Sequence, residues 1–295
     1  MTRTTVVIAT RDRPAELART LDSLRADSPA TPVVVVDNAS RDPLQLWLNA
    51  HHAGVEVIRL EENRGAAGRT VGARRADTEF VAFCDDDSTW DPGAFAVAER
   101  TFDSYPSLAV LAAHTLVGPH QRPDAITAAL AASPLPHPGP LPGPRVLGFL
   151  ACSAIVRRRA YLAVGGFDPL LHFAGEERML SLDLAVQGWD LCYLHSLVTR
   201  HYPSDVRPPS AWRRRRELRN DTLTDWMRRP VRAALGSSAR LFRRALADDC
   251  ARGAVRDVVR LLPVALARRR SLPANVERDV RLLETTPDPH PGVTP

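Results

Sequence analysis

Short hydrophobic runs alternate with amphipathic stretches in the first third of the chain. The runs predict buried strands at residues 5–9, 32–36, 55–60 and 80–84. Leu17, Leu21 and Leu24 mark one face of a helix after the first run, and helices are also expected over 43–52 and from the loop at 63–68 to residue 76. This alternation predicts an α/β fold, with a mostly parallel central sheet and helices on both faces.

The pattern is less regular beyond residue 90. It predicts helices at 91–104 and 158–164, a helix through Leu180 and Leu184, strands at 108–113 and 189–194, the second followed by 198–201, and an ordered segment at 145–156. Beyond Pro208 the chain reads as helical and basic, and Pro230, Pro263 and Pro273 are expected to divide it into short helices.

Proline occupies every second position from 134 to 144, within the sequence Ser-Pro-Leu-Pro-His-Pro-Gly-Pro-Leu-Pro-Gly-Pro. Such a segment forms neither a helix nor a central strand, because proline lacks the N–H that both need. We expect an extended, mobile loop, which serves either as a linker or as a flap over an acceptor site. Residues 285–295 read as a disordered tail.

Three adjacent carboxylates, Asp85, Asp86 and Asp87, directly follow the run at 80–84. Repulsion makes the triplet unfavourable unless a cation lies among the charges or water solvates them. The pattern therefore indicates either a solvated acidic turn or a divalent metal site. Polar clusters at 10–12 and 37–40 also follow predicted strands. Because such sheets bind ligands at the carboxyl ends of their strands, the recurrence favours a ligand site there.

Composition limits the class of protein further. The chain has 295 residues, 44% of them hydrophobic, and four cysteines without a CxxC pair. That usage argues against a zinc site or a disulfide scaffold and is typical of a reducing cytoplasm. The sequence begins Met-Thr-Arg-Thr-Thr and has neither a signal-peptide core nor a run of transmembrane length. We therefore expect a cytoplasmic protein.

Positive charge is concentrated near the C-terminus. The net charge is +5, and all 39 basic residues are arginine. Residues 207–270 hold 18 arginines and six acidic residues, an excess of 12 positive charges. A basic region of this size is suited to an anionic membrane surface, a phosphorylated partner or nucleic acid, although a solvated helix face is the simpler interpretation.

Seven motifs occur in a recognisable order. They are Thr10-Arg11, Asp37-Asn38-Ala39-Ser40, Asn63-Arg64-Gly65, Asp85-Asp86-Asp87, Gly165-Gly166-Phe167-Asp168, Glu176-Glu177 and His201. In this order and spacing, residues 4–230 resemble the family-2 inverting glycosyltransferases. The resemblance implies a single GT-A domain that uses a nucleotide-diphosphate sugar and a divalent metal, Mg²⁺ or Mn²⁺.

The resemblance implies a catalytic domain over residues 1–206. It would comprise a nucleotide-binding half (1–118), the Pro-rich loop (119–145) and a half for the acceptor and the catalytic base (146–206). A basic helical extension (207–284) and the tail (285–295) would follow. Peripheral contact with the inner membrane face through the arginine-rich helices is a further expectation.

The resemblance also implies roles for individual residues. Around the nucleotide it places Thr10, Arg11, Asp37, Arg64, Gly65, Asp85 and Asp86. At the metal, in a motif of the DXD type, it places Asp87, Asp85 and His201.

The expected catalytic base is a carboxylate at Glu176-Glu177, where the family has Glu-Asp. Such a base, opposite the departing diphosphate, takes the proton of the acceptor hydroxyl. The second member, Glu177, matches the base, but a shift of one residue would make it Glu176. The family often has another aspartate two residues later, where this chain has Met179, so the register stays open.

Two other functions are weighed against an inverting glycosyltransferase of class EC 2.4. A sugar-1-phosphate nucleotidyltransferase would carry a Gly-rich phosphate loop after the first strand, but residues 10–14 contain no glycine. A non-catalytic polyanion-binding protein would use the basic helices, yet no nucleic-acid motif is present. We expect a UDP- or dTDP-sugar donor, no nucleic-acid partner, and as acceptor a glycan, a lipid-linked sugar or a small natural product.

Overall fold

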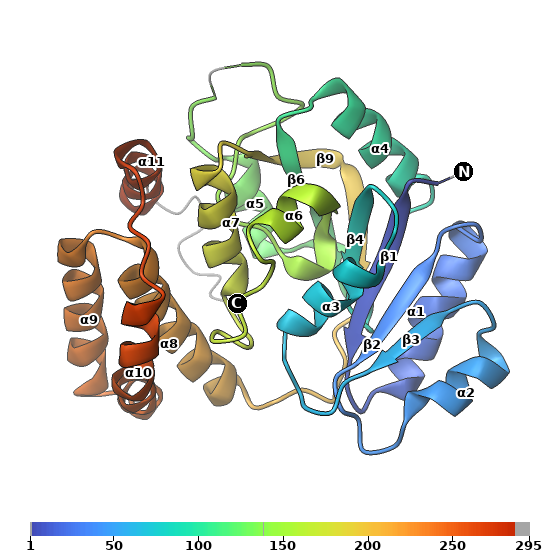
Figure 1. Ribbon diagram of the computed structural model, residues 1–295, viewed down its shortest axis with the longest axis horizontal. Coiled ribbons are helices and arrows are strands. Elements are labelled where there is room, and N and C mark those ends of the chain that lie inside the picture. The colour runs from blue at the N-terminus through green and yellow to red at the C-terminus, as the bar shows by residue number, and fades with distance from the viewer. Residues whose placement is uncertain (1, 138, 287–295) are drawn as a thin grey trace.

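The N-terminal part of the fold is a parallel sheet with helices on both faces (Figure 1). The computed structural model describes residues 2–137 and 139–286. Strands β1 (Thr4–Thr10), β2 (Val33–Asp37), β3 (Glu56–Arg59) and β4 (Phe80–Cys84) alternate with helices α1 (Pro14–Asp27), α2 (Leu44–His51) and α3 (Ala67–Arg75). β1 pairs in parallel with β2 and β4, and β2 with β3. The predicted α/β alternation is confirmed.

The second part of the sheet is mixed. It contains β5 (Ser88–Trp90), α4 (Ala94–Ser104), β6 (Leu108–Val117), β7 (Arg122–Pro123), α5 (Ala125–Ala131), the short 3₁₀ helix η1 (Ala151–Ser153), β8 (Ala154–Arg157), α6 (Arg158–Ala163), α7 (Glu176–Val186) and β9 (Asp190–His201). The strand order is β3-β2-β1-β4-β8-β6-β9-β5, with β7 on β6. β8, β5 and β7 run against their neighbours, whereas the other strands share one direction. The sheet is therefore mostly parallel, as predicted.

Residues of β1 divide between the two faces of the sheet. Val6 and Ile8 join the cluster that contains the leucines of α1, and Val7 joins the opposite cluster. On that side, a Cβ added at Gly72 of α3 would lie 2.5 Å from a methyl carbon of Val7. Glycine thus lets α3 approach the sheet closely, which places the start of α3 near the carboxyl ends of the strands.

The C-terminal helices form a layer beside α7 (Figure 1). They are α8 (Ser210–Arg228), α9 (Val231–Ala245), α10 (Asp249–Ala267) and α11 (Ala274–Thr285). Leu171 and Met179 share a buried cluster with Leu223 and Met227 of α8. Several ion pairs tie the layer to the preceding domain, among them Arg228–Asp183, Arg268–Asp168, Arg145–Asp279 and Arg178–Asp225. Part of the basic charge is therefore neutralised by acids of that domain.

Two sequence expectations need correction. Pro263 was expected to separate two helices, but α10 continues through it. Its ring is exposed, and the buried side of α10 packs against α8, so tertiary packing outweighs the lost hydrogen bond. The predicted segments 189–194 and 198–201 belong to one strand, β9 (Asp190–His201), with a bulge where Leu194 and Val198 pair with the consecutive residues Ala113 and His114.

The predicted tail, from residue 287 on, lies outside the described residues. In the part of the chain that the structure describes, no helix has both the length and the apolar character to cross a bilayer.

Candidate active site

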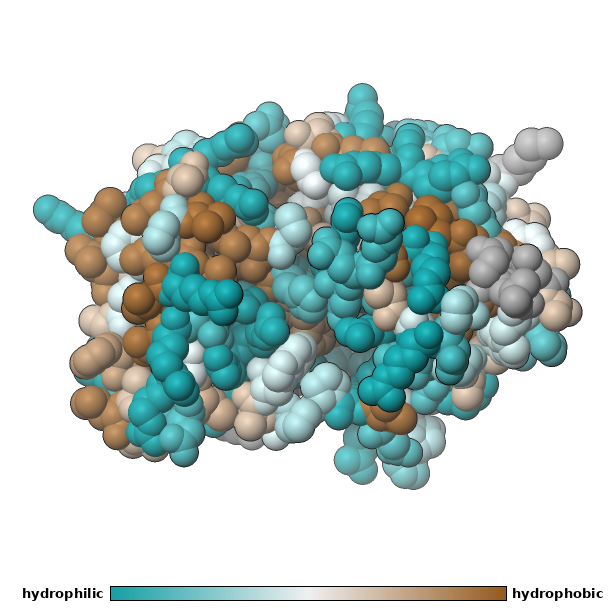
Figure 2. Space-filling view, turned by 60° about the horizontal axis from the view of Figure 1, so that its bottom comes forward, coloured by the Kyte–Doolittle hydropathy of each residue, from teal (hydrophilic) through white to brown (hydrophobic). Residues whose placement is uncertain are grey.

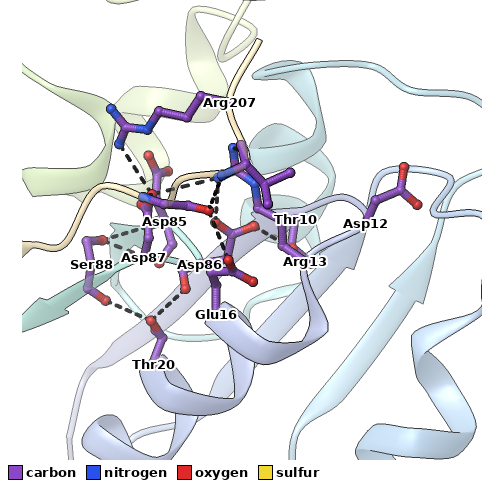
Figure 3. A network of polar contacts seen from close by, with 12 residues as sticks. Thr10, Asp12, Arg13, Glu16, Thr20, Asp85, Asp86, Asp87, Ser88 and Arg207 are labelled. Carbon is purple, nitrogen blue, oxygen red and sulfur yellow. Dashed lines mark hydrogen bonds and ion pairs between the residues drawn. The ribbon is translucent and has the colours of Figure 1, made fainter.

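The acidic triplet lies at the carboxyl end of β4, beside the end of β1 (Figure 3). The backbone turns at once, and the Asp85 N–H donates a hydrogen bond to Ser88 Oγ at 2.8 Å. The Thr10 hydroxyl at the end of β1 donates to Asp86 Oδ2 at 2.6 Å. The carboxylates of Asp85, Asp86 and Asp87 each have different partners.

Asp86 is a buried carboxylate, like Asp87. It accepts the hydrogen bond from Thr10 and a second one from Arg13 at 3.1 Å. Burial raises the pKa of Asp86 to about 6, although the Thr10 hydroxyl and the Arg13 charge act in the opposite direction. The site therefore holds one carboxylate that is close to neutralisation at mildly acidic pH.

Asp87 has the opposite character. Its Oδ1 lies 3.3 Å from His201 Nε2, and its Oδ2 accepts the N–H of Ser204 at 3.0 Å and lies 3.4 Å from Arg207. Burial alone would raise the pKa of Asp87, but the hydrogen bonds with His201 and Ser204 outweigh it and lower the pKa to about 2. Asp87 is therefore ionised at neutral pH. It pairs with His201, the last residue of β9.

Asp85 is linked to the predicted base through a buried arginine. Arg69 of α3 donates a short hydrogen bond to Asp85 Oδ1, and its guanidinium is also stabilised by the charges of Glu176 and Glu177. Burial disfavours the Arg69 cation, yet these carboxylates outweigh burial and raise its pKa. One guanidinium therefore lies among the acidic triplet and the Glu-Glu pair.

At the start of α7, Glu176 is buried and Glu177 is half-buried. Glu177 Oε1 accepts the N–H of Ala151 at 3.2 Å, whereas Glu176 Oε2 has no hydrogen-bond partner among the described residues. Burial raises the pKa of both carboxyls, and the charge of Arg69 opposes the rise. Carboxyls of raised pKa are suited to general acid–base work.

The end of β2 forms a compact polar corner. Asp37 is buried, and its carboxylate accepts the N–H of Ser40 at 2.8 Å and lies 3.4 Å from Arg59. The Ser40 hydroxyl accepts the N–H of Asp12 at 2.9 Å, which joins the loops after β1 and β2. The predicted clustering of polar loops at one sheet edge is therefore present.

Two predicted nucleotide residues, Arg11 and Arg64, border this corner, and the Arg64 N–H donates to Asn38 Oδ1 at 3.1 Å. Both side chains are half exposed, and each lies 3.5 Å from an acid close to it in sequence, Asp12 and Glu62 respectively. In the described structure they contact none of the buried carboxylates.

The Asn63–Gly65 loop is locked to the loop before α7. The Ala66 N–H donates to the carbonyl of His172 at 2.7 Å, and His172 Nε2 lies 3.2 Å from the carbonyl of Asn63. Gly65 has φ +56°, and a Cβ there would lie 2.1 Å from the same His172 oxygen. The Asn63–Gly65 loop, predicted to lie near the nucleotide, and the loop that leads to Glu176 thus form one unit.

A C-terminal helix holds this unit in place. Asn220 of α8 is completely buried, and its side-chain amide donates to the carbonyls of Leu171, Phe173 and Ala174 at 2.7–3.0 Å. Ala174 has φ +71°, a conformation that L residues rarely adopt without support. The helical extension therefore shapes the loop that precedes the predicted base.

A cavity of about 480 Å³ opens beside Asp86 and Asp87, between α1 and the ends of β5 and β9. Another, of about 530 Å³, lies between α7 and the C-terminal helices and contains none of the predicted site residues. No group of three His, Cys, Asp or Glu residues that could alone hold a metal occurs within the described ranges.

Sequence reasoning missed several side chains of this site: Arg13, Arg69, Ser204, Arg207 and Asn220. One signal was available for Arg69. It is the one charged residue in Ala67-Gly68-Arg69-Thr70-Val71-Gly72, the part of α3 that packs closely on the sheet. A charge in such a place requires a buried partner.

The fold matches the GT-A architecture of solved glycosyltransferases. The mannosyltransferase PcManGT from Pyrobaculum calidifontis, solved with GDP-Man and Mn²⁺, superposes with a TM-score of 0.58 at 18% identity over 96% of this chain and 79% of that one. S. aureus TarS 1–349, solved with UDP, gives a TM-score of 0.57 at 16% identity over 96% and 90% of the two chains. The predicted fold class is confirmed.

Residues 5–163 match the family model described as Glycosyl transferase family 2. The chain therefore belongs to that family, as its motifs indicated. A relative, the pre-mycofactocin glycosyltransferase of Mycobacterium tuberculosis, is 31% identical over 210 residues, which cover 64% of this chain and 40% of that protein. An uncharacterized glycosyltransferase of Haemophilus influenzae is 33% identical over 89 residues, 30% of each chain. The chain thus spans well under half of each relative that it matches.

Proposed function

We propose that this protein transfers a sugar from a nucleotide-diphosphate donor to an acceptor hydroxyl, with inversion at the anomeric carbon. One observation carries the proposal. At the sheet edge, Asp87 pairs with His201, and Arg69 connects Asp85 electrostatically with the Glu-Glu pair, although these residues are distant in the sequence. Membership of glycosyl transferase family 2 supports the reaction class. TarS solved with UDP-GlcNAc and PcManGT solved with GDP-Man support the donor class.

Asp87 and His201 fit a divalent cation that is shared with the donor diphosphate. Adjacent ligands in an octahedral Mg²⁺ shell are about 3 Å apart, and Asp87 Oδ1 and His201 Nε2 lie 3.3 Å apart. The low pKa of Asp87 keeps its oxygens available as ligands. Such an ion neutralises negative charge on the leaving diphosphate when bound. Arg13 and Arg207, which both lie against Asp87, add fixed positive charge on the same side.

The Glu-Glu pair is suited to the proton transfer. The acceptor hydroxyl has a high pKa and loses its proton as it attacks, so a carboxylate of raised pKa is a more effective base than a fully exposed one. Glu177 is anchored by the Ala151 N–H, whereas Glu176 keeps an oxygen without a partner in the described structure. The charge of Arg69 opposes the rise in the pKa of both carboxyls, and the same guanidinium donates a hydrogen bond to Asp85.

The polar corner at the end of β2 is suited to the nucleoside. Asp37 is fixed by Ser40 and Arg59, and Thr10 is fixed by Asp86, so their polar atoms are preorganised for base and ribose hydroxyls. The donor nucleotide in this proposal is UDP or dTDP. Residues 1–206 form the catalytic domain, and residues 207–284 add the helical layer.

A thermal-shift screen tests the proposal. UDP, dTDP, GDP and their sugars are added with and without Mn²⁺, and a nucleotide that binds the native state raises Tm. We expect one nucleoside diphosphate to give a shift that depends on the metal and is lost in Asp87→Asn. The absence of any nucleotide-dependent shift, in a protein that unfolds cooperatively, would refute the proposed donor class.

A further inference from the structure

The outer side of α9 carries an apolar stripe. Val231, Leu235, Phe242 and Leu246 lie at i, i+4, i+11 and i+15, a spacing that places them on one side of a helix. They are 51, 53, 62 and 74% exposed, whereas Ala234, Ser237 and Leu241 form the buried side of α9. The adjacent helix α10 exposes Val259 and Leu266. Large apolar side chains in such numbers indicate a surface that is covered in use.

Arginines border the stripe. Residues 231–270 contain ten arginines and three acids, an excess of seven positive charges. Arg232, Arg243, Arg256 and Arg260 are exposed, and within residues 2–137 and 139–286 none of them forms an ion pair. Figure 2 shows apolar side chains gathered on the side of the C-terminal helices, with strongly polar ones between them.

We propose that this α9–α10 face, defined by these apolar and arginine side chains, binds the surface of an anionic lipid bilayer. A helix with an apolar side and an arginine-rich edge lies in the headgroup region, with its apolar residues among the acyl chains and its arginines at the phosphates. The apolar stripe would thus contact the acyl chains, and the adjacent arginines would contact the lipid phosphates.

The same charges argue against other occupants. In a symmetric dimer through this face, the arginines of one copy would meet those of the other, because a two-fold interface pairs identical patches. Such an interface would bring the exposed Arg232, Arg243, Arg256 and Arg260 of both copies together. A nucleic acid would match the arginines but leave the apolar stripe without a role. Only an anionic amphiphilic surface satisfies both features.

Vesicle co-sedimentation tests the proposal without any assay of transfer, so it is independent of the proposed function. The full chain is mixed with vesicles of phosphatidylcholine alone or with about one third phosphatidylglycerol, a proportion that gives a strongly negative surface. We expect binding to the anionic vesicles, weakened by salt. Phe242→Ser with Leu246→Ser lowers the partition coefficient by about tenfold or more, and Arg232→Ser with Arg243→Ser by about fivefold for each arginine.

Matched controls separate this face from general stickiness. Val186→Ser removes an exposed apolar side chain on α7, and Arg100→Ser removes an exposed arginine on α4; both variants should bind as the parent does. Equal binding to neutral and anionic vesicles, or equal loss in the controls, would overturn the proposal. A second outcome would also overturn it: the protein does not bind the vesicles but forms dimers, and the Phe242→Ser, Leu246→Ser variant does not form them.

Discussion

The arginines at the strand-edge site and those on the outer C-terminal helices face opposite surroundings. Arg69 and Arg13 have side chains 8 and 21% exposed, and each lies against a carboxylate of the acidic triplet. Arg232 and Arg243 are exposed on α9. In a low-dielectric site a guanidinium shifts the pKa of its neighbours, whereas in water its charge is screened within about 10 Å. All these arginines count equally in the composition, but only those at the strand-edge site can change the pKa of a reacting group.

The largest expected effect is the loss of Asp87. Asp87→Asn removes the anion that meets His201 and the positive side chains, and we expect the kcat/KM for sugar transfer to fall by about a thousandfold or more. Initial rates at several donor concentrations, with and without Mn²⁺, measure it. Asp103→Asn, an exposed acid on α4 paired with Arg3, is the matched control. Normal, metal-independent transfer by Asp87→Asn would show that the edge is not the reaction centre.

The next largest effect is expected for the loss of the catalytic base. Glu177→Gln and Glu176→Gln keep the size of each side chain but remove its basicity, and the variant of the true base should lose about a hundredfold or more in kcat. Donor affinity, measured by calorimetry, should stay within about twofold, because the base acts on the acceptor. Glu61→Gln, on an exposed loop, is the control. If both variants retain full kcat, the proton is taken by another group.

Arg69 sets the pH at which that base works. Burial raises the pKa of Glu176 and Glu177 and the Arg69 charge lowers it, so Arg69→Gln raises it further. Because the base must be ionised, activity rises with pH through its pKa, and the acid limb of the kcat/KM profile should move towards higher pH. On that limb the rate should fall about tenfold. Arg74→Gln, exposed on the same helix, should leave the profile in place; an unmoved limb in Arg69→Gln would disprove the link.

A smaller, positional effect is expected for Asn220. Asn220→Leu removes the side-chain donor of the Phe173 and Ala174 carbonyls, whereas the Leu171 carbonyl keeps Arg219 as a donor. We expect a loss of about 2 kcal/mol in the free energy of unfolding and a severalfold lower kcat. Asn220→Asp keeps the shape but turns an acceptor towards those carbonyls, so it should be worse than leucine. Equal effects of leucine and aspartate would indicate a packing role only. Asn275→Leu, exposed on α11, is the control.

The smallest effect belongs to the outer helices. Arg243→Ser removes an exposed charge that has no ion-pair partner among the described residues. Chemical denaturation should show a change within about 0.5 kcal/mol in the free energy of unfolding. A loss several times larger would mean that this arginine has a structural partner, and the contrast between the two groups of arginines would then fail.

The sequence was a good guide wherever structure follows from local pattern. The strands around Val6, Val34 and Val81 are continuous apolar runs, and the edge at which Asp87 and Asp37 lie follows from parallel strand order. Partners contributed by distant segments could not be read in this way. No spacing shows that Arg69 binds Asp85 and feels the charge of Glu176, because both depend on how closely α3 approaches the sheet.

Tertiary packing also decided the elements that were wrong. Pro263 is a local helix breaker, but α10 buries Val258 and Ala265 on either side of it and continues. Nothing in the sequence indicated that α8 supports the loop before α7. Asn220 in a basic helix reads as a surface residue until the loop that contains Phe173 is folded against it. The assignment of Glu177 or Glu176 as base is still a prediction, as are the nucleotide roles of Arg11 and Arg64.

The close contact at Gly65 has a consequence for engineering. Any side chain at this position would push the carbonyl of His172 aside by more than an ångström, since a Cβ would lie only 2.1 Å from it. Loops on either side of the site are therefore not independent modules that can be exchanged for a new donor or a new acceptor. A library that varies residues 63–65 should vary 172–174 together with them, because the two segments accept changes only as a pair.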